Sequence, residues 1–185
     1  MRKSLITLVL ICASFLSYAQ IDLKTFLGAG YGQENKIGFR GMSIHAEEQF
    51  NFSTHLNGIV GLNYFSSNNV PKWGMAENQG VYYRQFIAEV KAQYFSGQEQ
   101  GKGFLAGIGL ALRSGSTYHF ESGDYKNGSY SNLQYSKEKI VGNGIVLGLG
   151  YGFKISESLI GKIEFSDYSM AQLNELYQLS VKVGF

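Results

Sequence analysis

Residues 174–185 read NELYQLSVKVGF, and the pattern of this segment indicates the fold class of the chain. Its odd positions, from Tyr177 to Phe185, are apolar or aromatic, whereas its even positions, from Gln178 to Gly184, are polar or small. Successive side chains of a β-strand point to opposite faces, so this alternation predicts a strand with one apolar face and one polar face. The segment ends on an aromatic residue, Phe185.

Seven further segments alternate in the same way and complete a predicted set of eight strands. They are residues 23–33, 39–52, 56–65, 81–95, 104–113, 140–153 and 159–168. Within residues 81–95, the side chains of Glu89, Lys91 and Gln93 share one side only at a period of two, which excludes an amphipathic helix there. The predicted connections alternate between short turns and longer loops, a feature that is typical of outer-membrane barrels.

The N-terminal segment has the features of a secretory signal peptide. Arg2 and Lys3 precede an apolar run over residues 5–16, and small residues at Ser17 and Ala19 fit a cleavage site after Ala19. We therefore expect a signal peptide over residues 1–19 and one barrel domain over residues 20–185. The sole cysteine lies within this signal, so the expected mature chain has no disulfide or thiolate metal site.

Charge gives no indication of a nucleic-acid partner. The formal net charge of +2 comes from 16 basic and 14 acidic residues, and the two basic residues Arg2 and Lys3 lie in the expected signal. The expected mature chain is therefore neutral by this count, which is not the balance of a nucleic-acid-binding domain.

Aromatic residues gather near both ends of the predicted strands and predict two interfacial girdles. Those at the short-turn end are Phe50, Phe52, Tyr94, Phe95, Phe104, Tyr151, Phe153 and Phe185. Those at the loop end are Tyr31, Phe39, Tyr64, Phe65, Tyr82, Tyr83 and Tyr168.

With these strands and the terminal Phe185, the chain resembles the small outer-membrane barrels of the OmpA/OmpX type. Its Gly- and Tyr-rich composition also resembles the outer-membrane β-barrel family that is common in Bacteroidetes. The resemblance implies an all-β fold, a transmembrane antiparallel up-and-down barrel of eight strands, with the long loops outside the cell. It implies outer-membrane lipid and lipopolysaccharide as surroundings, and a barrel assembly machinery that reads Phe185.

Eight charged residues are predicted to point into the barrel: His45, Glu47, Glu89, Lys91, Arg113, Lys162, Glu164 and Lys182. An eight-stranded barrel has an interior about wide enough to be filled by side chains. Buried charges need partners, so these residues predict a salt-bridge network that fills the lumen. Such a network resembles the interior charge cluster of OmpA-type barrels. The alternatives are a narrow ion path and a catalytic carboxylate pair, Glu47 with Glu89.

No residue is predicted to be catalytic or to bind a metal or cofactor. His45, His55 and His119 form neither a helical metal pair nor a His-rich tract. Some outer-membrane barrels that modify lipid use Ser and His on the outer surface, but Ser43 and His45 are predicted to point inward. The Gly-rich residues 142–152 lack the Gly-Lys-Ser/Thr ending of a phosphate loop.

The predicted loop over residues 114–139 is the strongest candidate for an extracellular contact surface. Tyr118, Phe120, Tyr125 and Tyr130 lie there among small polar residues, as in adaptable recognition surfaces, and Trp73 marks a second loop. The alternative is that residues 114–139 extend two strands as a hairpin with its tip at residues 124–128.

The sequence as a whole favours a non-enzymatic outer-membrane barrel with a structural or surface-interaction role through its extracellular loops. Three other functions stay open. They are a narrow porin-like channel, an outer-membrane lipid-modifying enzyme, and a soluble lipocalin-like periplasmic barrel in which the same alternating faces are inverted.

Overall fold

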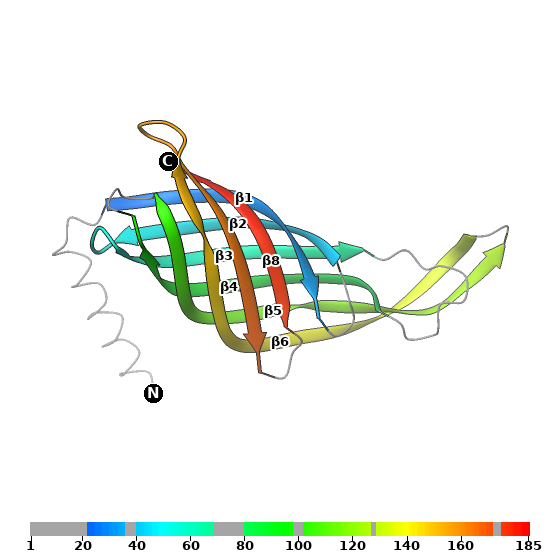
Figure 1. Cartoon of the computed structure of the whole chain (residues 1–185). Coiled ribbons are helices and arrows are strands. Elements are labelled where there is room, and N and C mark those ends of the chain that lie inside the picture. Colours follow the sequence, from blue (N-terminus) through cyan, green and yellow to red (C-terminus); the bar gives the residue numbers. More distant parts are fainter. Residues whose placement is uncertain (1–21, 36–39, 69–79, 98–101, 127–128, 172–174) are drawn as a thin grey trace.

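In the computed structural model, eight antiparallel strands close into a barrel in sequence order (Figure 1). The strands are β1 (Asp22–Glu34), β2 (Arg40–Asn51), β3 (Leu56–Asn68), β4 (Gly80–Phe95), β5 (Gly103–Lys126), β6 (Ser129–Lys154), β7 (Ile160–Met170) and β8 (Leu176–Gly184). The structure describes residues 22–35, 40–68, 80–97, 102–126, 129–171 and 175–185. The predicted fold class is confirmed, whereas the expected signal peptide lies outside the described residues. No helix in this described part is long and apolar enough to cross a membrane.

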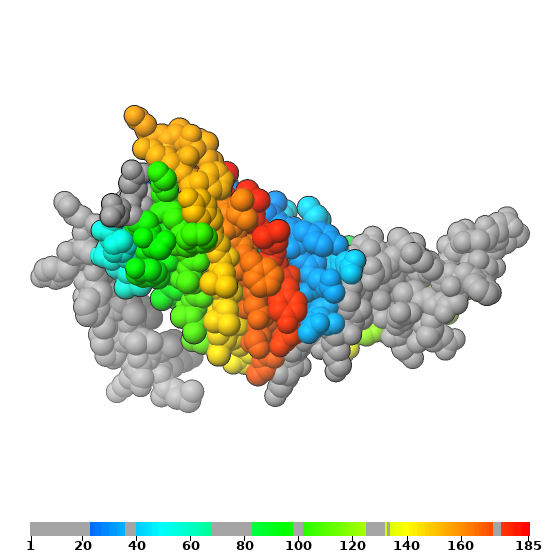
Figure 2. Space-filling view, viewed as in Figure 1, coloured from blue at the N-terminus to red at the C-terminus, as the bar shows by residue number. Residues whose placement is uncertain are grey.

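The strands are staggered around the barrel. A row of paired residues starts at Lys139 on β6, passes through Ser116 on β5 and Arg84 on β4, and continues around the wall. The row returns to β6 at Leu149, ten positions away from Lys139. Such a stagger requires strands that tilt by about 40° from the barrel axis, and Figure 2 shows them as tilted bands side by side.

The apolar faces of the strands point outward and the polar faces point into the barrel. Leu110 and Phe104 are 71% and 72% exposed, whereas Lys162 and Glu164 are fully buried. A soluble lipocalin-like barrel requires the reverse arrangement, so that alternative is wrong for this chain. Because the closed wall pairs its backbone groups internally, such a barrel can sit in lipid without exposing a sheet edge.

The outward apolar band has the height of a bilayer core. On β6, outward apolar residues run from Tyr151 through Leu147 to Val141. With a rise of about 3.3 Å per residue and a tilt of about 40°, each residue climbs about 2.5 Å along the barrel axis. These ten steps therefore span about 25 Å, which is the height of the apolar band in outer-membrane barrels.

Residues 114–126 and 129–139 form the paired strands of a hairpin, so the prediction of a long loop there is wrong and the hairpin alternative holds. β5 and β6 have 24 and 26 residues and stay paired from Gly103↔Gly152 to Lys126↔Ser129. The hairpin extends beyond the barrel at the end opposite the C-terminus (Figure 1). Its Ser-, Gly- and Asn-rich composition is typical of a loop, but cross-strand pairing satisfies the backbone and keeps it extended.

The two aromatic girdles contain fewer outward-facing rings than the sequence predicts. Tyr94, Phe104 and Tyr151 lie on the outer surface near the short turns, with the rings of Phe104 and Tyr151 5.4 Å apart. Four other members of the predicted girdles are instead buried inside the barrel: Phe65, Tyr83, Phe95 and Tyr168. Neighbouring residues on a strand point to opposite faces, so an aromatic pair such as Tyr94-Phe95 contributes one ring to each side.

Candidate functional site

A cluster of buried ion pairs fills the middle of the lumen. The Lys91 ammonium lies 2.9 Å from Glu164, 3.0 Å from Glu89 and 3.7 Å from Glu47. Lys182 pairs with Glu47 and lies 2.7 Å from Glu164. The strands β2, β4, β7 and β8 each contribute to this central cluster, which the sequence places far apart and the barrel brings together.

Glycines on the neighbouring strands make room for the central cluster. Gly61 is the cross-strand partner of both Glu47 and Glu89, and a Cβ atom there would lie 3.0 Å from the Glu89 side chain. Gly28 pairs with Lys182, where a Cβ atom would lie 2.6 Å from the lysine Cγ. The long charged side chains therefore fold over positions that carry no side chain of their own.

Lys162 occupies a separate position nearer the short turns. Its ammonium donates to the side-chain oxygens of Gln49 and Gln93 at 2.5 and 3.4 Å. The ring of Phe26 lies 3.7 Å from this ammonium, and the ring of Phe95 lies 5.7 Å away. With Lys162 included, the lumen holds three lysines against the three glutamates of the central cluster, so these six charges balance.

Toward the hairpin end, an apolar cluster closes the lumen. Its members are Phe65, Tyr83, Ile87, Ala111, Val146, Tyr168, Met170 and Leu176. Tyr168 also joins this apolar plug to the polar layer, because its hydroxyl oxygen accepts a hydrogen bond of 3.3 Å from Asn63. Asn63 in turn donates to Gln178. The sequence did not predict this polar bridge. The inward positions of Asn63, Tyr168 and Gln178 in their alternating strands could have indicated it.

Besides Lys162, two further residues of the predicted lumen network lie outside the central cluster. Arg113 is buried among the apolar plug, with its guanidinium 5.3 Å from the centre of the Tyr83 ring. His45 is buried beside Ser43, and its Nε2 atom lies 2.8 Å from the Ser43 hydroxyl. The prediction of one network of eight residues is therefore too broad. The alternation along a strand gives the face to which a side chain points, but neither its level along the barrel axis nor its partner.

The predicted hairpin contacts have different positions. Tyr118 is half-buried, and the Lys137 ammonium lies 5.6 Å from the centre of its ring. Phe120 is only 4% exposed, so the prediction that it offers a contact surface is wrong. Its exposure was predicted from the loop-like composition around it, whereas residues 114–126 belong to a paired strand whose register with β6 shifts between Phe120 and Ser122. The side chains of Tyr125 and Tyr130, and all of Trp73, lie outside the described residues.

A polar contact holds the seam between β1 and β8 at the hairpin end. The Glu175 carboxylate accepts hydrogen bonds from the Tyr177 hydroxyl at 2.6 Å and from the Asn35 amide at 3.1 Å. These two donors, Tyr177 first, hold the pKa of Glu175 below its usual value. The contact therefore weakens as the pH falls and the carboxylate takes up a proton.

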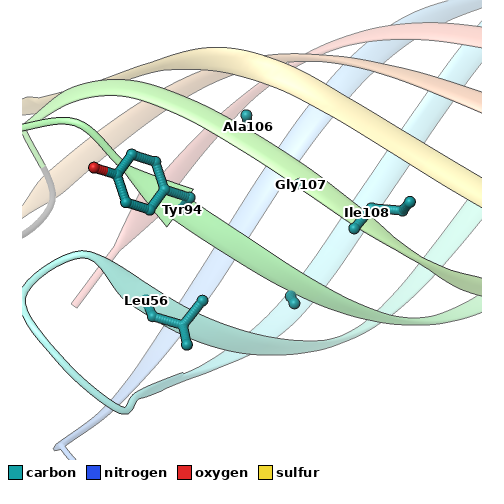
Figure 3. A pocket seen from close by; sticks show the side chains of 6 residues that line it. Leu56, Tyr94, Ala106, Gly107 and Ile108 are labelled. Atoms are coloured by element: carbon teal, nitrogen blue, oxygen red, sulfur yellow. The ribbon is translucent and has the colours of Figure 1, made fainter.

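The outer wall carries two shallow grooves between larger apolar side chains. One groove, of about 310 Å³, lies near the short turns, where Ala92 and Ala106 sit between Leu56, Tyr94 and Ile108 (Figure 3). The second groove, of about 560 Å³, lies closer to the hairpin. Its floor is at Ala88, and its sides include Leu62, Leu110, Leu112 and Asn143.

No family model matches the chain, and no curated protein matches its sequence. Among solved structures, Neisserial surface protein A matches with a TM-score of 0.55 at 14% identity, over 88% of this chain and 95% of that one. A major outer membrane protein from Thermus thermophilus matches with a TM-score of 0.56 at 11% identity, over 88% and 98%. The attachment invasion locus protein Ail of Yersinia pestis matches with a TM-score of 0.52 at 10% identity, over 88% and 98%.

These likenesses cover nearly all of each neighbour and show the fold. The chain has the architecture of the small eight-stranded outer-membrane β-barrels, in agreement with the closed wall and the outward apolar band. The predicted resemblance to such barrels is thereby confirmed at the level of the fold.

Proposed function

We propose that the protein is a non-enzymatic integral outer-membrane barrel that meets partners outside the cell through its β5–β6 hairpin. The observation that carries this proposal is the asymmetry of the barrel. One end has short turns, whereas β5 and β6, with 24 and 26 residues, continue well beyond the apolar band at the other end. We further propose that the chain is exported with the signal peptide 1–19 and inserted by the barrel assembly machinery.

The filled lumen argues against the porin-like alternative. A conducting pore needs a continuous water-filled path, but the central cluster and the apolar plug lie one above the other inside this barrel. Lys91 and Glu164 are fully buried in their side chains, and so are Phe65 and Tyr168. Planar-bilayer recording is expected to show no steady conductance, and a stable open channel would favour the porin-like function.

The position of the side-chain contact between Ser43 and His45 also supports a non-enzymatic function. Ser43 and His45 are 1% and 2% exposed and point into the lumen, so membrane lipid on the outside cannot reach the Ser43 hydroxyl. A lipid-modifying enzyme needs its nucleophile on the lipid-facing wall or at an open site. The two grooves on the outer wall are lined mainly by apolar residues, and neither serine nor histidine is among their lining residues.

Protease treatment of intact cells tests the orientation of the barrel. Lys137 and Lys139 are exposed on the hairpin, whereas Lys154 is exposed at the short-turn end. External trypsin should cut at the hairpin in intact cells, and cutting at Lys154 should require permeabilised cells. The opposite pattern would place the hairpin in the periplasm and overturn the proposal.

Removal of the hairpin tests its role. A variant with residues 117–139 replaced by a two-residue turn should still give a heat-modifiable barrel, because the wall below Ser116 is unchanged. Cells with this variant should adhere to surfaces and to one another less than cells with the full chain at equal surface abundance. Equal adhesion by both strains would leave the barrel with a structural role only.

A further inference from the structure

Three cations lie together on the outward face of the hairpin base. Arg84 on β4 pairs with Ser116 on β5, and Ser116 pairs with Lys139 on β6, so Arg84 and Lys139 are two strands apart in one row. This separation is about 10 Å between backbones, within the joint reach of two long side chains. Lys137 lies two residues before Lys139 on β6 and therefore on the same face of the strand. These residues, Arg84, Lys137 and Lys139, form the basic row.

The basic row lies at the membrane boundary. Directly below it on the same outward faces are Phe86, which is 63% exposed, and Val141, which is 73% exposed. At a climb of about 2.5 Å per residue, Lys139 lies about 5 Å and Lys137 about 10 Å above Val141. That is the level of the lipid headgroups of the outer leaflet when the apolar band spans the bilayer.

The basic row has no carboxylate partner among the residues that the structure describes. All three side chains are exposed. The nearest acidic residue along β6, Glu138, pairs with His119 at 3.2 Å. The Lys137 ammonium lies 5.6 Å from the centre of the Tyr118 ring, and no carboxylate in the described part of the chain forms an ion pair with it. Three uncompensated cations in one place favour an anionic ligand.

The larger groove lies directly beneath the basic row. Ala88, Leu112 and Asn143 form a row across the same three strands, two outward positions below Arg84, Ser116 and Lys139. The groove of about 560 Å³ lies where Ala88 is small between its cross-strand neighbours Leu62 and Leu112. Most of the residues that line it are apolar. This volume is within the range of small-molecule sites. An apolar groove in the membrane band, with cations above it, matches an acyl chain below a charged headgroup.

We propose that this face binds one phosphorylated lipid of the outer leaflet, with its phosphate on the basic row and an acyl chain in the groove at Ala88. The proposal rests on the proposed insertion in the outer membrane and adds a defined lipid site on β3 to β6. Arg84 supplies a planar guanidinium that accommodates two phosphate oxygens, and the two lysines supply point charges.

Native mass spectrometry of the purified barrel in a neutral detergent tests the site. The probe is lipid A with both phosphates, and the matched probe is the same lipid after dephosphorylation. The unsubstituted protein should bind the phosphorylated form more tightly. Each basic residue near a lipid surface contributes roughly fivefold to binding, so Arg84→Gln, Lys137→Gln and Lys139→Gln together should weaken binding by on the order of 100-fold.

A control removes the same charge elsewhere. The control variant replaces three lysines at the short-turn end. It combines Lys24→Gln, Lys102→Gln and Lys154→Gln, and its affinity for lipid A should be unchanged. Ala88→Trp fills the groove and should weaken binding of lipid A while the basic row stays intact. Heat-modifiable mobility on a gel verifies that each variant forms the barrel.

Equal binding of the two lipids by the unsubstituted protein would overturn the proposal, and that comparison needs no variant to fold. Equal loss in both triple variants would also overturn it, since a general charge effect would then explain the binding. Unchanged affinity in Ala88→Trp would remove the groove from the site. A protein absent from the outer membrane would overturn the proposed function, whereas an outer-membrane barrel without phosphate preference would overturn this inference alone.

Discussion

At the scale of single residues, the lumen depends on Lys91. Its ammonium lies within 4 Å of three carboxylates, those of Glu47, Glu89 and Glu164, and all four side chains are buried. Ion pairs in such a place contribute little net stability compared with apolar packing, but the loss of one partner leaves the others without compensation. The stability of the barrel therefore depends on Lys91 mainly because its removal would leave buried carboxylates without a counter-charge, rather than because of the net attraction in the ion pairs.

Replacement of Lys91 by methionine should destabilise the barrel by about 3–5 kcal/mol, because Glu89 would lose its ion pair and Glu47 and Glu164 would share Lys182. The measurement is equilibrium unfolding in urea of the protein folded in lipid vesicles. Lys154→Met, at an exposed position, should change the free energy of unfolding by less than about 0.5 kcal/mol. Similar values for the two variants would show that the central cluster is not coupled through Lys91.

The glycine opposite two of these carboxylates is a second residue-scale requirement. Gly61→Val should cost about 1–3 kcal/mol, because a Cβ atom would lie 3.0 Å from the Glu89 side chain and 3.3 Å from Glu47. Gly107→Val is the matched control, since a Cβ atom there meets nothing closer than 3.4 Å. Both unfolding free energies are measured in the same vesicles. A larger cost at Gly107 than at Gly61 would contradict the packing described here.

At the scale of the strands, each element has one face for lipid and one for the lumen. β4 shows this most clearly, since Val90 is 61% exposed between Glu89 and Lys91, which are 3% and 2% exposed. In the part of β5 and β6 above the membrane this alternation is lost, since Lys137, Glu138 and Lys139 are all exposed. There the outward face changes from apolar to basic at Lys139, which marks the upper limit of the apolar band.

An arginine in the centre of the lipid-facing side of β4 should be costly. Val90→Arg is expected to lower the free energy of unfolding in vesicles by about 2–4 kcal/mol, because the charge would lie near the middle of the bilayer. Leu56→Arg, at the short-turn end of β3, should cost only about 0–1 kcal/mol, since the side chain reaches the interface. Equal costs at the two depths would contradict the position of the apolar band.

At the scale of the whole molecule, closure depends on the seam between the first and last strands. The backbone of Phe185 exchanges hydrogen bonds of 3.1 and 3.3 Å with Thr25, and its side chain is 62% exposed on the outer wall. The residue can therefore contribute to the seam through its backbone and to recognition by the assembly machinery through its ring. The second role stays a prediction from the sequence resemblance.

Deletion of Phe185, compared with Phe185→Ala, separates these two contributions. We expect lower abundance in the outer membrane together with a smaller heat-modifiable fraction in cells, because both the ring and the last backbone bonds are lost. Phe185→Ala keeps the backbone bonds, so it should refold in detergent like the unsubstituted chain yet assemble poorly in cells. Normal cellular abundance of both variants would contradict the predicted role of Phe185 in assembly.

The sequence by itself determined the strand number, the up-and-down order and the side on which most residues lie. These properties follow from a local rule, because alternation with a period of two is written in each segment independently. That rule placed Glu47, Glu89, Lys91, Glu164 and Lys182 inside the barrel before any pairing was known.

Only the tertiary structure decided which of these side chains meet. The stagger between strands sets the height of each residue, and so it separates Arg113 and His45 from the central cluster and places Arg84 and Lys139 two strands apart in one row. Pairing across β5 and β6 keeps residues 114–126 and 129–139 extended, because it satisfies a backbone that their composition alone would leave in a loop. Height and pairing are properties of the closed wall as a whole, which a local alternation in the sequence cannot specify.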